Sequence, residues 1–189
     1  AAKDADLIII SSEYKDLFDK SRVKILVYEE LNSINSCNIQ HTECFYNKEA
    51  MKTLLFTSGT TGSPKLISYS WSNLEASAKA WQQVVNFQNR QSYLCCLKLH
   101  HIGGFSILSR SLILNLKFVL LNYYDVKLLV ASGLNTNAKY LSIIPKMFYD
   151  LISTNSGKKL LNQLDAIILG GDIIHEDIIN IAINSKLNL

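Results

Sequence analysis

Residues 57–65 combine hydroxyl, glycine and lysine side chains in the order Thr-Ser-Gly-Thr-Thr-Gly-Ser-Pro-Lys. Hydroxyl groups donate hydrogen bonds to an anion, and glycines allow backbone N–H groups to turn toward the same point. A lysine at the end of the loop adds a mobile positive charge. These residue types at this spacing predict a polyphosphate site. Its expected members are Thr57, Ser58, Gly59, Thr60, Thr61, Gly62 and Lys65.

This loop differs from the Walker A loop of P-loop ATPases. In Walker A the lysine follows the second glycine directly, whereas Ser63 and Pro64 separate Gly62 from Lys65 here. A P-loop ATPase is therefore disfavoured. The alternative is an ordinary Ser/Thr/Gly-rich surface loop, a composition that is common but rarely adopts this order between two strands.

Composition restricts the classes of protein. The chain has 189 residues, 48% hydrophobic and 19% charged, which is typical of a globular domain with a sizeable core. A formal charge of +3 with scattered lysines does not indicate nucleic acid as a partner. No apolar run approaches the roughly 20 residues of a transmembrane helix. We expect a small-molecule ligand and a cytoplasmic protein, or one of the plastid stroma if the gene is organellar, in an undetermined oligomeric state.

Cysteine and histidine spacing gives no sign of a metal centre. Cys37, Cys44, Cys95 and Cys96 lack Cys-x-x-Cys spacing. Cys95 and Cys96 fall in an apparent strand, where they are expected to act as small apolar residues in a reducing compartment. The run His175-Glu176-Asp177 is better explained by acidic residues in the first turn of a helix than by metal ligation.

Strand-like and helix-like runs alternate along the chain, which predicts an α/β fold with a mainly parallel sheet flanked by helices. Ser72, with Glu75 three residues later, is the expected N-cap of a helix that continues to about Phe87. Residues 30–50 are expected to form a loop or linker. Strands are expected at 7–10, 24–28, 54–57, 66–69, 93–97, 118–121, 140–144 and 166–169, and further helices at 107–114, 126–131, 145–152 and 176–183.

A second group of candidate residues lies where one predicted strand runs into a glycine pair. The segment 97–106 reads Leu-Lys-Leu-His-His-Ile-Gly-Gly-Phe-Ser. Ligands in open α/β sheets bind at the carboxyl ends of strands, so His101 is placed where a site is expected. A histidine satisfied locally in a turn is the alternative. A third group, Gly170-Gly171-Asp172, ends another strand, and paired glycines allow a flat ring to approach the backbone closely.

Residues 57–65 resemble the phosphate-loop signature of the adenylate-forming superfamily, which includes acyl- and aryl-CoA ligases, peptide-synthetase adenylation domains and luciferases. All nine positions fit. The resemblance implies the large N-terminal domain of an enzyme that uses ATP and Mg²⁺ to form an acyl-adenylate, then CoA as co-substrate. It also implies catalytic roles for Lys65 and His101, and nucleotide contacts from Gly170, Gly171 and Asp172.

Segment 101–112 is most similar to the O-succinylbenzoate–CoA ligase branch, in which His-x-x-Gly-Leu-Ser-x-Leu-x-Arg is typical. The resemblance implies substrate contacts from His101, Gly103, Ser106 and Arg110, and a place in menaquinone or phylloquinone biosynthesis. An arginine suits the second carboxylate of that acid. The alternatives for Arg110 are a solvated helix residue or a structural ion pair.

The chain departs from the superfamily pattern at three positions: Lys98 replaces proline, His100 replaces an aromatic residue, and Asp172 replaces alanine. Residues 1–50 are expected to end a preceding α/β subdomain, and 51–189 to form an incomplete AMP-binding core, without the Tyr-Gly-x-Thr-Glu motif and the C-terminal domain. A fragment of this kind is expected to be inactive alone. Another carboxylate adenylator and a non-catalytic remnant are the alternatives.

Overall fold

The computed structural model describes residues 7–17, 24–27, 47–50, 52–57 and 65–189. The chain divides into two compact units, residues 1–45 and 46–189. In the first unit, β1 (Leu7–Ile10) and β2 (Lys24–Val27) pair in parallel, and a 3-10 helix, η2 (Ser12–Leu17), follows β1. Most of the predicted linker, and Cys37 and Cys44 within it, lie outside the described residues.

A four-stranded parallel sheet forms the centre of the second unit, with strand order β6-β5-β7-β8. This sheet confirms the predicted α/β fold class. The order reverses beside β5, because the chain adds β6 on one side and then β7 on the other. The strands are β5 (Ser92–Cys95), β6 (Lys117–Leu120), β7 (Tyr140–Ile143) and β8 (Ala166–Leu169).

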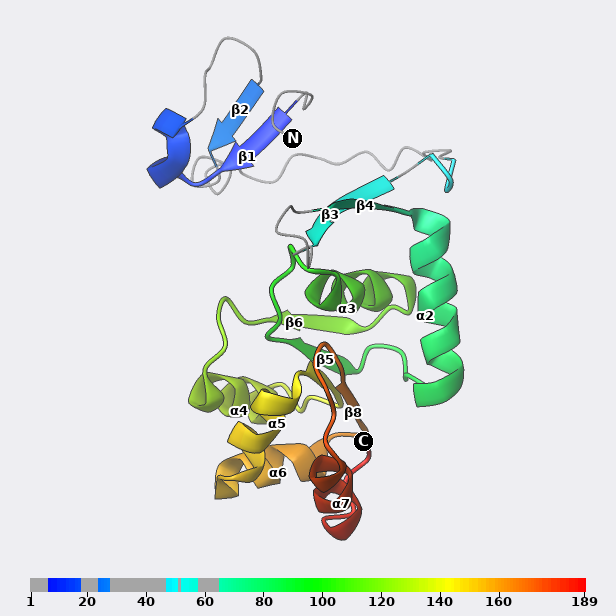
Figure 1. Cartoon of the computed structure of the whole chain (residues 1–189), viewed down its shortest axis with the longest axis vertical. Coiled ribbons are helices and arrows are strands. Elements are labelled where there is room, and N and C mark those ends of the chain that lie inside the picture. The colour runs from blue at the N-terminus through cyan, green and yellow to red at the C-terminus, as the bar shows by residue number, and fades with distance from the viewer. Residues whose placement is uncertain (1–6, 18–23, 28–46, 51, 58–64) are drawn as a thin grey trace. The chain divides into compact units, whose positions relative to one another are not determined.

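Helices cover both faces of this sheet (Figure 1). Successive strand side chains point to opposite faces, so Tyr93 and Cys95 pack with α2 and α3, while Leu94 and Cys96 pack with the other helices. The second face is covered by α4, α5, α6 and α7. The helices are α2 (Trp71–Val85), α3 (Ile102–Ile113), α4 (Val126–Asn135), α5 (Pro145–Ile152), α6 (Asn155–Gln163) and α7 (Glu176–Asn184).

The phosphate loop predicted from the sequence joins two antiparallel strands, β3 (Lys52–Thr57) and β4 (Lys65–Ser70). Thr57 pairs directly with Lys65, and the Thr57 hydroxyl donates a hydrogen bond to the Lys65 carbonyl at 3.3 Å. Residues 58–64 lie outside the described ranges. The hairpin therefore holds the two ends of the loop side by side.

Helix α2 begins two residues earlier than predicted, so the assignment of Ser72 as its N-cap is wrong. Ser70 is the N-cap: its hydroxyl accepts from the Asn73 N–H at 3.2 Å, and the Asn73 side chain accepts from the Ser70 N–H at 3.0 Å. This reciprocal pair leaves Glu75 free to bind two lysines instead. Asn86, in the left-handed conformation at φ 53°, ends the helix.

Glu75 forms ion pairs with Lys48 at 2.5 Å and with Lys79 at 2.9 Å. The hydrogen bonds from Lys48 and Lys79 lower the pKa of Glu75 from 4.5 to about 2. Because the folded pKa is depressed, the pairs stabilise the fold above pH 4.5 and cease to do so as the pH falls toward 2. We expect Glu75→Gln to remove this part of the acid dependence of the unfolding midpoint. A carboxyl NMR titration of Glu75 with a midpoint near its ordinary value would contradict this expectation.

Helix α3 begins at Ile102, five residues before the predicted start at Ile107. Its first turn contains Gly103 and Gly104, which discouraged a helical assignment because glycine is a poor helix former. Helix α6 has no counterpart among the predicted elements. Among the residues that the structure describes, none of the helices combines the length and apolar character needed to cross a membrane.

Candidate functional site

A cavity of about 800 Å³ opens at the carboxyl ends of the four parallel strands. Residues directly after β5, β6, β7 and β8 line it, and the hairpin of β3 and β4 contributes Leu55, Phe56, Thr57 and Tyr69. The volume falls in the range of sites that enclose a small organic ligand. This is the edge of a parallel sheet, beside the reversal of strand order, where ligands bind in open α/β folds.

The cavity brings together residues that are far apart in the sequence. Seven of the predicted site residues line it, from three separate segments: Thr57, His101, Gly103, Ser106, Arg110, Gly170 and Gly171. Lys65 and Asp172 do not line it. Ser58, Gly59, Thr60, Thr61 and Gly62 lie outside the described residues, so their phosphate-binding role stays a prediction.

Lys65 is the exposed first residue of β4, directly across the hairpin from Thr57. No carboxylate among the described residues forms an ion pair with its ammonium group. The hydroxyl of Thr57 is held by the Lys65 carbonyl, and Thr57 lines the cavity. Within the described ranges, Lys65 thus has no ion-pair partner at the end of the loop that begins at Thr57 on the cavity wall.

His101 is the N-cap residue of α3, with extended backbone and an exposed ring. The ring lies 4.3 Å from that of His100, centroid to centroid, and His101 and Lys98 both line the cavity. Lys98, His100 and Asp172 are the three positions that depart from the superfamily pattern. Of these, only Lys98 lines the cavity among the described residues. The His101 side chain accepts no hydrogen bond from the backbone N–H groups in the first turn of α3.

Gly170 and Gly171, which follow β8, differ in why glycine suits each position. Gly171 adopts φ 81°, which disfavours any residue with a Cβ atom. A Cβ atom at Gly170 would meet no other atom within 4 Å, so this backbone borders open space on the cavity wall. Asp172 is exposed, and its carboxylate accepts a hydrogen bond from the Ile173 N–H at 2.8 Å. Its predicted nucleotide contact stays a prediction.

Arg110 is 4% exposed, so the alternative that it is a solvated helix residue is wrong. Its guanidinium lies 5.0 Å from the Trp81 ring centroid, and its Nη1 donates to the Tyr93 hydroxyl at 2.7 Å. Nε finds no acceptor among the described residues, and no described carboxylate lies within ion-pair distance. The reading of a structural ion pair has no support in that part of the chain. A buried cation without an anionic partner is costly, so this arrangement favours an anionic ligand.

The described residues on the cavity wall include basic side chains but no acidic ones. Lys98, His101 and Arg110 line it, and none of the described residues on its wall is acidic. Across the described residues, no group of three or more His, Cys, Asp and Glu side chains gathers as a metal site would require. The cavity therefore suits an anion, and the described wall offers a metal ion no carboxylate.

Cys96 also lines the cavity but is not suited to nucleophilic chemistry. Burial raises its pKa to about 12, and that of Cys95 to about 11, so both remain thiols at neutral pH. Both are unpaired in the described part of the chain. This agrees with the expected role of both cysteines as small apolar residues.

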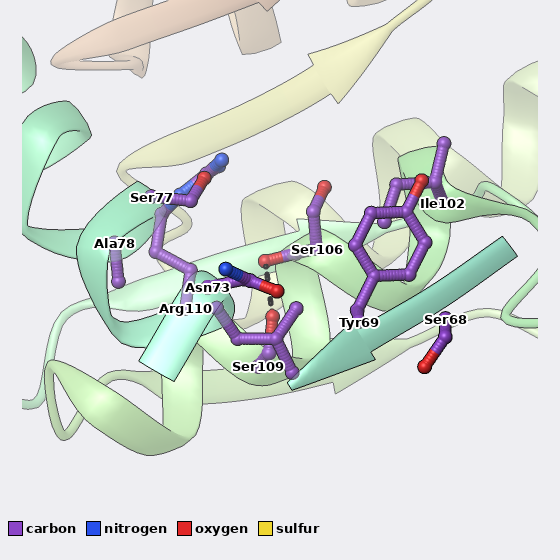
Figure 2. Close-up of a pocket in the computed structure, with 10 residues that line it drawn as sticks. Ser68, Tyr69, Asn73, Ser77, Ala78, Ile102, Ser106, Ser109 and Arg110 are labelled. Atoms are coloured by element: carbon purple, nitrogen blue, oxygen red, sulfur yellow. Dashed lines mark hydrogen bonds between the residues drawn. The ribbon is translucent and has the colours of Figure 1, made fainter. Parts of the chain in front are cut away.

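Figure 2 shows a smaller pocket of about 380 Å³ among β4, α2 and α3. Asn73 and Ser77 come from α2, and Ser106 and Ser109 from α3, where the Ser109 hydroxyl donates to the Ser106 carbonyl at 3.2 Å. Arg110 lines this pocket as well as the large cavity. Helix α3 therefore presents its residues to both spaces.

Gly104→Ala is expected to destabilise the fold, because a Cβ atom there would collide with the carbonyl oxygens of Lys98 and Leu97, the latter at 2.7 Å. Backbone atoms do not move aside easily, so a loss of about 1–3 kcal/mol in the free energy of unfolding is expected. Gly103→Ala is the matched control, since its Cβ atom would make an ordinary 3.4 Å contact with the Leu97 side chain. Equal unfolding midpoints for both variants in denaturant would contradict this reading.

Sequence reasoning missed three residues at the site. Trp81 packs in the core and also lines the cavity. Ser142 lines the cavity and bonds to Tyr93, which holds Arg110. A serine in an apolar strand was the one available signal, because a buried hydroxyl needs a partner.

Comparisons with known proteins agree with this geometry. The AMP-binding enzyme family matches residues 4–183. The 2-succinylbenzoate–CoA ligase of Bacillus cytotoxicus is 26% identical over 169 residues, which are 89% of this chain and 34% of that protein. A ligase of the same name from Bacillus cereus strain Q1 is 29% identical over 129 residues, 68% of this chain and 27% of that protein. The matched part of the chain thus spans between about a quarter and a third of the length of these relatives.

Solved structures share the fold. The O-succinylbenzoate coenzyme A synthetase of Bacillus subtilis, in complex with ATP and magnesium, has a TM-score of 0.80 at 22% identity, over 96% of this chain and 38% of that one. The N-terminal domain of FACL13 from Mycobacterium tuberculosis has a TM-score of 0.75 at 16% identity, over 96% of this chain and 48% of that one. With the family match over nearly the whole length, the chain belongs to the AMP-binding enzyme family.

Proposed function

We propose that this chain is part of the large N-terminal domain of an AMP-forming carboxylate–CoA ligase whose acid is 2-succinylbenzoate, an enzyme of menaquinone or phylloquinone biosynthesis. One observation carries the choice of acid: buried Arg110 has no carboxylate partner among the described residues and lies on the wall of a cavity with no described acidic residue. 2-Succinylbenzoate has a second carboxylate beyond the one that reacts. A monocarboxylic acid would leave Arg110 unpaired.

The reaction joins two anions, so the task of the site is to manage charge. One carboxylate of the acid attacks the α-phosphate of ATP to give an acyl-adenylate and pyrophosphate. The thiol of CoA then attacks the acyl carbonyl, and AMP leaves. Lys65 and the hydroxyls of residues 57–61 hold the phosphates by position and charge rather than as acids or bases. His101 and Ser106 border the acyl group, and Gly170 and Gly171 border the nucleotide.

The described residues fit ATP better than they fit a free metal ion. Thr57 and the open backbone at Gly170 lie on the same cavity, which suits a nucleotide stretched between them. The described wall has no carboxylate for Mg²⁺. When bound, Mg²⁺ would neutralise phosphate charge, beside the positive charge that Lys65 would supply.

Direct binding tests the choice of acid. The 189-residue chain is titrated by calorimetry with 2-succinylbenzoate, benzoate and a medium-chain fatty acid. An affinity for 2-succinylbenzoate at least about tenfold above that for benzoate is expected, because one charge-assisted contact contributes about 1.5–3 kcal/mol. Equal affinities for 2-succinylbenzoate and benzoate would mean that the chain belongs to an adenylate-forming ligase that acts on another acid. In the complete enzyme, ATP–pyrophosphate exchange that depends on the same acid tests the reaction itself.

A further inference from the structure

Lys98 is an exposed cation just after the carboxyl end of β5, the strand beside which the order of the sheet reverses. It lines the large cavity, whose described wall has no acidic residue. Among the described residues, no carboxylate lies within ion-pair distance of its ammonium group. The described part of the chain therefore leaves this charge to water or to an anionic ligand.

The backbone that carries Lys98 is held by the start of α3. The Lys98 carbonyl accepts a hydrogen bond from the His101 N–H at 3.1 Å, which closes a tight turn between β5 and the helix. Gly104, in the first turn of α3, packs so closely on the Lys98 and Leu97 carbonyls that a Cβ atom would collide with both. Lys98 thus combines an anchored backbone with a long, flexible side chain at the N-terminal end of α3.

Lys98 and Arg110 lie toward opposite ends of α3 on the same cavity. Gly104, on which the Lys98 carbonyl packs, precedes Arg110 by six residues of helix, which is about 9 Å along the axis. Arg110 is buried and bonded to Tyr93, whereas Lys98 is exposed. A planar guanidinium suits a carboxylate, and a compact, hydrated ammonium suits a phosphate as a point charge. The positive end of the helix dipole lies at the Lys98 end.

We propose that Lys98 binds the α-phosphate of ATP and of the acyl-adenylate. The inference rests on the proposed function, because an acid with its second carboxylate at Arg110 directs its reacting carboxylate toward the other end of α3, where the α-phosphate meets it. In this step a carboxylate oxygen bonds to phosphorus and the bond from phosphorus to the pyrophosphate oxygen breaks, without proton transfer. Lys98 offsets the repulsion between the two anions as they approach.

Removal of the charge tests the inference. The complete enzyme with Lys98→Met is titrated by calorimetry with ATP, AMP and adenosine. Affinities for ATP and AMP should both fall about tenfold, because each loses one charge-assisted contact. Affinity for adenosine, which has no phosphate, should change by less than about twofold. The ratio of the affinities for 2-succinylbenzoate and benzoate should stay at the wild-type value, since Arg110 determines it.

Two further variants separate a local contact from a change in net charge. Lys127→Met is the matched control, because Lys127 is an exposed lysine on α4 that lines neither cavity. It removes the same charge and should bind all three nucleotide ligands as the wild type does. Lys98→Arg keeps a cation at the position and should restore most of the affinity for AMP. The unfolding midpoint of Lys98→Met should equal that of the wild type, since the side chain is exposed.

The outcomes distinguish this inference from the proposed function. If Lys98→Met binds AMP as tightly as Lys127→Met does, Lys98 does not bind the α-phosphate and the inference is overturned. A loss confined to ATP would place the ammonium at the departing pyrophosphate and would also overturn it, as would equal losses for AMP and adenosine. A wild-type enzyme without a preference for 2-succinylbenzoate would overturn the choice of acid, while the AMP titration decides the role of Lys98 separately.

Discussion

Arg110→Ala is expected to weaken 2-succinylbenzoate binding by about 2–5 kcal/mol, which is about thirtyfold or more in the dissociation constant. The guanidinium is buried, held at Nη1 by Tyr93, and has an unpaired Nε. A ligand carboxylate that forms a desolvated ion pair with this guanidinium would lose that pair in the variant. The measurements are acid affinity by calorimetry and, in the complete enzyme, KM for the acid.

Two controls make this result specific. Affinity for benzoate and for ATP should change little, because neither is proposed to contact Arg110. Arg110→Lys retains the charge without the planar fork and should give an intermediate loss. Equal losses for benzoate and 2-succinylbenzoate would mean that Arg110 holds Trp81 and Tyr93 in place and has no direct role in choosing the acid.

Lys65→Ala is expected to slow adenylate formation about tenfold to a hundredfold in the complete enzyme, since one charge-assisted contact contributes about 1.5–3 kcal/mol. Lys65 is exposed at the start of β4, so its removal should leave the unfolding midpoint unchanged. The measurement is ATP–pyrophosphate exchange at saturating acid.

Lys117→Ala is the matched control for Lys65→Ala. Lys117 is likewise the exposed first residue of a strand, β6, and it lines neither cavity. It should leave the exchange rate at the wild-type value. Lys65 has no part in the reaction if both variants exchange pyrophosphate at the same rate.

Most elements of the second unit were predictable from local signals. The β8 strand and helix α5 have the predicted bounds, Ala166–Leu169 and Pro145–Ile152. In α5 the proline lies in the first turn, where its missing N–H removes no helix bond. Short apolar strands bounded by turns and a proline-started helix carry their signals within a few residues, so no distant contact was needed.

Helix α6 was missed because its stability depends on contacts that local propensity does not include. Gly157 lies inside the helix, where glycine is normally unfavourable. A Cβ atom at this position would collide with the Leu151 carbonyl and would lie 2.7 Å from the Thr154 hydroxyl, which caps the helix through the Gly157 N–H. Leu160 and Leu161 then pack into the core. Close approach to the end of α5 explains this glycine.

The sequence by itself predicted the α/β class and the order of most strands and helices, since each depends on residue type and spacing within a short segment, and the phosphate-binding role of residues 57–65 stays a prediction. Only the tertiary structure decided how Arg110 is placed. Its burial, its contact with Trp81 from α2 and its bond to Tyr93 from β5 join three elements. The position of buried Ser142 on the cavity wall, bonded to Tyr93, likewise depends on pairing between β5 and β7. Burial and side-chain partners are properties of packing between distant segments, and one sequence without a fold does not specify them.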